Sequence, residues 1–183
     1  MADAKTLLQK YVSDMVSLES HIYQAIDKQA KGNKDNPQIK TKFETFAQTM
    51  KSHTDGLSAR LQELGGAANQ PVKQGVAVVA GVAAGLIDKM RSEEVSKDFR
   101  DDITALNLSL VSYSMLHTTA LSLGDRQTAE LAARFAKEDA DFISYMHKML
   151  PGIVLRELKQ NHDVTPDESV AEETNKLVAD LWK

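Results

Sequence analysis

The chain has 183 residues, of which 42% are hydrophobic and 26% charged, which is the balance of a globular protein rather than a disordered one. The formal net charge of −4 gives no basic patch for a nucleic-acid partner, and the absence of cysteine excludes disulfides, thiol chemistry and zinc knuckles. The first residues have no basic stretch followed by an apolar run, so no secretory signal is predicted. The longest apolar run, residues 76–87, is shorter than the ~20 residues of a membrane span. We therefore expect a cytoplasmic protein without a membrane span.

Two long helices are predicted in the first third of the chain. Apolar residues recur with helical spacing over residues 4–30 and again over 38–64, and a turn-forming stretch, residues 31–37, separates them. Gly56 lies inside the second helix, where glycine costs about 1 kcal/mol relative to alanine. We therefore expect Gly56 to allow close contact with another helix.

The segment that follows has a different character. Residues 75–87 are small and apolar on every side, which favours a short buried helix in a crossover between the second and third long helices. A contact between two copies of the chain is the alternative interpretation of this segment.

Helical spacing returns over residues 96–123 and 126–150, with a tight break at Gly124 and Asp125. Pro151 and the glycine after it predict a break or kink, and a last amphipathic helix is predicted from Pro166 to Trp182. The whole chain, residues 1–183, is expected to be one domain, with a core bundle over 4–150 and a C-terminal extension over 151–183.

The lengths of the connections predict the topology. Short turns join the first pair and the second pair of helices, so each pair is antiparallel, whereas the long middle connection lets the third helix start at the opposite end. This is the connectivity of ferritin-like bundles. We predict an all-α, ferritin-like antiparallel four-helix bundle, with a long crossover containing a short apolar helix and with an added C-terminal helix.

Four ionisable residues lie on the apolar stripes near the middle of their helices: Glu19, His53, Glu138 and Asp139. A buried unpaired charge is expensive, so such residues are expected to be paired or to bind a metal. Mid-helix residues of an antiparallel bundle share one layer, and carboxylates with an imidazole are ligands for iron, manganese or zinc. Periodicity does not decide which of Glu138 and Asp139 faces inward.

Several short motifs follow one another in order over roughly residues 5–150: Tyr11 and Glu19 within residues 7–29, His53-Thr54, Arg60-Leu61, Leu64-Gly65, residues 121–124, residues 129–131 and Glu138-Asp139. In this order and spacing the chain resembles the YciE/YciF-like family of ferritin-like bacterial stress proteins. The resemblance implies a di-metal carboxylate fold that is usually dimeric.

The chain departs from a complete di-metal centre, which needs about six ligands. Met50 occupies the position three before His53, and residues 103–110 of the third helix contain no carboxylate. His117 lies on the stripe but about two turns, ~10 Å, away from the layer. We therefore expect the second metal position to be absent, leaving either one metal position or a buried polar cluster without metal.

Three functions remain open from the sequence. We favour a stress-associated homodimer with a degenerate di-metal centre, without catalysis and without a cofactor. The first alternative is a protein with a single iron or manganese ion and oxidase or peroxide-detoxifying activity. The second is a helical protein–protein interaction module, whose partner surface would lie on the C-terminal helix.

Overall fold

The computed structural model describes residues 4–32, 36–66, 95–162 and 164–181. Within these residues the backbone forms five helices and no strand: α1 (Ala4–Gly32), α2 (Pro37–Glu63), α4 (Val95–Ser122), α5 (Arg126–Asn161) and α6 (Val170–Leu181). The predicted all-α bundle of four long helices is confirmed, whereas the apolar helix predicted within residues 76–87 lies outside the described residues. None of the described helices is long and apolar enough to span a membrane.

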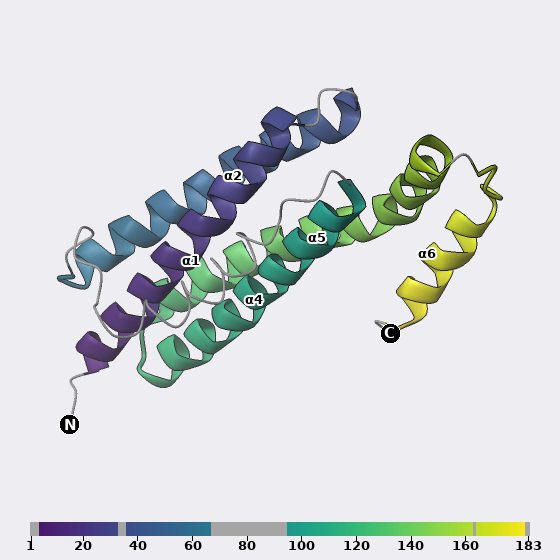
Figure 1. Ribbon diagram of the computed structural model, residues 1–183. Coiled ribbons are helices and arrows are strands. Elements are labelled where there is room, and N and C mark those ends of the chain that lie inside the picture. The colour runs from purple at the N-terminus through teal and green to yellow at the C-terminus, as the bar shows by residue number, and fades with distance from the viewer. Residues whose placement is uncertain (1–3, 33–35, 67–94, 163, 182–183) are drawn as a thin grey trace.

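The four long helices form two antiparallel pairs, α1 with α2 and α4 with α5, and α6 lies apart at the C-terminal end (Figure 1). The pairs meet where α1 contacts α4 and where α2 contacts α5. Because α2 and α4 run in the same direction, the end of α2 and the start of α4 lie at opposite ends of the bundle (Figure 1). This topology agrees with the one predicted from the connection lengths.

Glycines with positive φ follow the ends of α2 and α4. Gly65, after α2, has φ of 79°, and Gly124, after α4, has φ of 76°. In each case the next N–H donates to the carbonyl five residues earlier, at 2.9 Å, which is the Schellman motif that favours glycine at this position.

Aromatic side chains close one end of the bundle. The ring of Phe43 lies 5.2 Å from the rings of both Phe99 and Phe142, and Phe46 stacks on Phe142 at 3.7 Å. These four side chains come from α2, α4 and α5 and are buried. They fill the core where the second and fourth long helices approach the start of the third.

A hydrogen-bonded arginine closes the other end. Arg60, near the end of α2, donates to Thr128 Oγ1 at 2.8 Å and to Asp125 Oδ2 at 2.6 Å. Asp125 is the N-cap of α5, and its other oxygen accepts the N–H of Thr128 at 3.0 Å. Arg60 therefore ties the end of α2 to the start of α5.

Of the break or kink predicted at Pro151, the break is wrong, because α5 continues through the proline to Asn161, and the kink stays a prediction. Proline in a helix interior costs about 3 kcal/mol. Two contacts beyond it oppose this cost. Ile153 is buried in the core, and Glu157 Oε1 accepts the N–H of Ser96 at 2.9 Å, so that the end of α5 satisfies a free donor at the start of α4.

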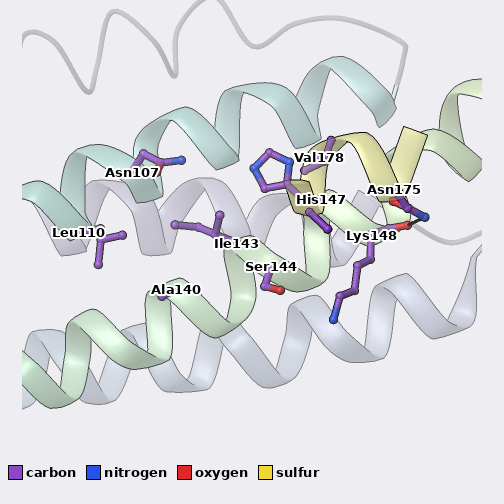
Figure 2. Close-up of a pocket in the computed structure, with 10 residues that line it drawn as sticks. Asn107, Leu110, Ala140, Ile143, Ser144, His147, Lys148, Asn175 and Val178 are labelled. Atoms are coloured by element: carbon purple, nitrogen blue, oxygen red, sulfur yellow. Dashed lines mark hydrogen bonds between the residues drawn. The ribbon is translucent and has the colours of Figure 1, made fainter. Parts of the chain in front are cut away.

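The last helix is shorter than predicted, since α6 begins at Val170 rather than at Pro166. None of its described residues is buried. Asn175 donates to the carbonyl oxygen of Lys148 at 3.3 Å, and a pocket of about 320 Å³ separates α6 from α4 and α5 (Figure 2). The helix therefore contacts the bundle at one edge, while Leu177 and Leu181 are exposed.

We expect replacement of Arg60 by methionine to lower the free energy of unfolding by about 2 kcal/mol, because it removes charge-assisted hydrogen bonds between α2 and α5. Thermal and urea unfolding followed by circular dichroism would measure the change. Lys51→Met is the matched control, since Lys51 pairs with Asp55 on the exposed face of the same helix, where an ion pair contributes about 0.5 kcal/mol or less. Equal effects of the two substitutions would contradict the assigned role of Arg60.

Candidate metal centre

Between the two closed ends, His53 of α2 is held between three carboxylates. Its Nδ1 lies 3.3 Å from Glu19 Oε2 of α1 and 3.7 Å from Asp139 Oδ1 of α5. Its Nε2 lies 2.8 Å from Glu138 Oε2 of α5. All four residues predicted from the sequence therefore meet around one imidazole ring.

The helix α4 also contributes a side chain to this layer, a serine that was not among the predicted site residues. Ser109 Oγ lies 2.6 Å from Glu19 Oε1 and 2.8 Å from Asp139 Oδ2. Ser109 is fully buried, whereas its neighbour Leu110 is only partly buried. The sequence does indicate that Ser109 faces the core, because it lies three residues after Leu106 and four before Tyr113, as expected for one face of a helix.

The two neighbouring acids on α5, Glu138 and Asp139, differ in how far their side chains are buried. The side chains of Glu19, His53 and Asp139 are 0% exposed, whereas that of Glu138 is 41% exposed. Adjacent positions of a helix point about 100° apart. Asp139 therefore faces the core, and Glu138 reaches the other side of the imidazole ring from the surface between α2 and α5.

Aromatic rings hold the imidazole in place. Phe135 of α5 stacks on His53 with ring centroids 4.1 Å apart, and Tyr113 of α4 meets both rings edge-on. A Cβ atom on Gly56 would lie 3.0 Å from the Phe135 ring. The prediction that Gly56 allows a close helix contact is confirmed, and the contact is with the ring that supports His53.

Three donor atoms converge on one point. One atom from each of Glu19, His53 and Asp139 lies within 4.8 Å of the other two. Metal–ligand bonds of about 2.1 Å place neighbouring ligand atoms roughly 3.0–3.5 Å apart, close to the measured 3.3 and 3.7 Å from Nδ1. Asp139 Oδ1 is buried and has no hydrogen-bond partner among the described residues, so the residues fit a metal ion better than a finished polar network.

The remaining atoms of the same side chains are held by other groups. Ser109 contacts Glu19 Oε1 and Asp139 Oδ2, which leaves the opposite oxygens directed at Nδ1. Glu138 accepts a hydrogen from Nε2, which favours the His53 tautomer with an unprotonated Nδ1. This pattern of a carboxylate behind a metal-ligating histidine is widespread in metal sites.

Without a metal, these contacts require additional protons. The single hydrogen of the Ser109 hydroxyl cannot bridge both Glu19 and Asp139, so one of these carboxyls must also donate. A neutral His53 likewise cannot donate to carboxylates from both ring nitrogens. If His53 starts as a neutral imidazole and all three acids as carboxylates, the contacts need two more protons, one for Ser109 and one for His53. A divalent cation carries the same charge of +2 as those two protons.

The electrostatics of Asp139 agree with this requirement. Burial, and then the charge of Glu19, raises the pKa of Asp139 well above its ordinary value of 3.8. Burial, and then the charges of Glu19 and Asp139, also raise the pKa of the buried Tyr113 hydroxyl. The centre is therefore strained by negative charge when it holds no cation.

A second metal position is not formed by the described residues. Glu19, His53 and Asp139 are the only set of three metal-binding residue types close enough to share an ion in the described part of the chain. Met50 is buried one turn before His53, as expected. His117 is partly exposed, and Leu116 takes the place on the α4 stripe that was predicted for it.

We expect Asp139→Asn to stabilise the metal-free protein at pH 8. Because the folded-state pKa of Asp139 is raised, the folded chain binds this proton more strongly than the unfolded chain does. The stability of the metal-free wild type should therefore fall as pH rises from about 4 through the folded-state pKa, and the asparagine should remove this loss. Urea unfolding between pH 4 and 8 in chelator measures it.

Asp141→Asn is the control on the same helix, because Asp141 is exposed and pairs with Lys137. It should leave the pH dependence of stability unchanged. A metal-free Asp139→Asn protein that is less stable than wild type at pH 8, with the same pH slope, would contradict the strained centre.

Comparison with solved structures supports the fold. A protein of Xanthomonas campestris pv. campestris superposes with a TM-score of 0.71 and 18% identity, over 86% of this chain and 98% of that one. A bacterioferritin of Desulfovibrio desulfuricans, described with its diiron site in different catalytic states, superposes with a TM-score of 0.67 and 16% identity, over 94% of this chain and 88% of that one. These similarities establish a ferritin-like fold.

No curated protein matches the sequence. Residues 3–159 match the family described as "Domain of unknown function (DUF892)", a range that covers α1, α2, α4, all but the last two residues of α5, and all residues of the centre. The chain therefore belongs to the DUF892 family.

Proposed function

We propose that the chain binds one divalent transition-metal ion, iron or manganese, between Glu19, His53 and Asp139. The observation that supports this most is the division of atoms within the centre. Glu19 Oε2, His53 Nδ1 and Asp139 Oδ1 face one another, while Ser109 and Glu138 hold the opposite atoms of the same side chains. A relic that had become an ordinary buried cluster would not need an unpartnered carboxylate oxygen.

The donor set suits these metals. One imidazole and two carboxylates are the ligands of non-haem iron and of manganese, and they leave coordination positions open. When bound, the ion would supply a Lewis-acidic, redox-active centre. The chain's own residues would orient the ligands, through Ser109 and Glu138, and exclude water, through Phe135 and Tyr113.

We infer that this is metal binding without turnover of an organic substrate. The three ligand side chains are fully buried, so an organic molecule could not reach the ion without separating the helices. Glutamate at the Ser109 position and a carboxylate in place of Met50 would be needed to rebuild a second metal position. The centre is therefore proposed to be half of a di-metal centre that retains one ion.

The biological setting is also a proposal. We propose that the chain acts as a cytoplasmic homodimer and as a stress-associated protein of the YciE/YciF-like kind. The support is the order of motifs from Tyr11 to Asp139 together with membership of the DUF892 family.

We expect titration calorimetry with Mn²⁺ under anaerobic conditions, and with Fe²⁺ as a second ion, to give about one ion per chain. Binding should raise the stability by about 2.7 kcal/mol at a free metal concentration one hundred times Kd. His53→Gln should abolish saturable binding. Ser109→Ala, which leaves all three ligands in place, should weaken binding by 10- to 100-fold, a range typical of residues that support ligands.

His117→Gln is the control, because it changes a partly exposed histidine outside the layer. It should bind as wild type does. If wild type and His53→Gln both fail to bind Mn²⁺ and Fe²⁺, the centre is a buried polar relic and the proposed function is wrong.

A further inference from the structure

We propose that metal ions enter the buried centre through the groove between α2 and α5, with Glu138 as their first ligand. This inference rests on the proposed metal function and adds to it the path by which the ion arrives. Its basis is the exposure of Glu138, the pocket beside it and the closure of both ends of the bundle.

Glu138 is where the polar layer meets solvent. Its side chain is 41% exposed and its Oε2 lies 2.8 Å from His53 Nε2. The side chains of Glu19, His53 and Asp139 are 0% exposed, and Ser109 is equally buried. A cation that approaches this layer from solvent therefore meets Glu138 before any other carboxylate of the centre.

A pocket of about 210 Å³ adjoins Glu138 between α2 and α5. Its wall contains two carboxylates and one lysine, with threonines and phenylalanines between them: Lys42, Thr45, Phe46, Thr49, Glu138, Asp141 and Phe142. Each water molecule takes ~30 Å³ in the liquid, so an ion with six waters needs roughly 200 Å³. The pocket is thus large enough for a hydrated divalent cation.

Within the part of the chain that the structure describes, side chains fill both ends of the bundle. Phe43, Phe99 and Phe142 fill one end with aromatic rings, which a hydrated ion cannot cross without losing its water. At the other end, Arg60 joins α2 to the start of α5, and its charge is offset by Asp125 and Glu63. The pocket beneath α6 is lined mainly by apolar groups and contains none of the centre's residues (Figure 2).

The last step of entry must pass the His53 ring. Nε2 faces Glu138 and Nδ1 faces Glu19 and Asp139, so the ring separates the surface carboxylate from the buried ones. An ion held first by Glu138 would reach the buried oxygens and Nδ1 when the ring turns aside. Phe135, stacked 4.1 Å away, restricts that motion, so both entry and release should be slow.

The test fills the pocket without changing a ligand. Thr49→Trp places an indole in the groove, and Thr118→Trp, on the exposed face of α4, is the matched control. Stopped-flow absorbance would follow Co²⁺ binding, and a chelator chase would follow its release. Thr49→Trp should slow association and dissociation by the same factor, roughly tenfold or more, and leave Kd unchanged, because it obstructs a path and touches neither end state.

Asp141→Asn gives a second test, through charge. It should slow association a few-fold at low salt, and this effect should disappear near 1 M salt, where the screening length is about 3 Å. If Thr49→Trp does not fold, Thr45→Trp lines the same pocket from an exposed position.

The outcomes separate the two proposals. Wild-type rates in a folded Thr49→Trp or Thr45→Trp protein that binds Co²⁺ normally would overturn the route and leave the metal function standing. Failure of the wild-type protein to bind Co²⁺ at equilibrium would overturn the metal function, and the route with it.

Discussion

The contacts of the His53 imidazole with carboxylates from two other helices are the constraint on which the rest of the structure depends. A carboxylate at 0% exposure is tolerated only with partners, and removing one partner of a buried pair costs about 3–5 kcal/mol. Each of the four long helices supplies one buried group to the layer: Glu19, His53, Ser109 and Asp139. Sliding any helix by one turn would leave a buried carboxylate unpaired, so the layer fixes the relative positions of all four.

The same layer is strained when no cation is present. Burial raises the pKa of Asp139, and one of its oxygens has no partner among the described residues. The opposing stabilisation lies at the two ends, in the aromatic cluster around Phe43 and in the hydrogen bonds of Arg60. Strain at a site combined with well-packed surroundings is typical of a functional centre, because evolution retains such strain only where it is used.

Much of this architecture could be predicted from the sequence, because helical periodicity and turn residues act locally. The four ionisable residues were found because each interrupts an apolar stripe. Ser109 was missed because a serine among leucines carries no charge to draw attention. The course of α5 beyond Pro151 could not be predicted, since it depends on the contact of Glu157 with the start of α4. The roles of Glu138 and Asp139 depend on where His53 of α2 lies. The helical periodicity of α5 carries no information about that position.

Anomalous diffraction from crystals grown with Mn²⁺ is the most direct test of a metal ion bound between Glu19, His53 and Asp139, because it locates the ion without reference to any activity. We expect one peak per chain, about 2.1 Å from Glu19 Oε2, His53 Nδ1 and Asp139 Oδ1, with Glu138 still bonded to Nε2. A peak at the surface beside Glu138 alone would contradict the claim, as would a saturated crystal with no peak in the polar layer.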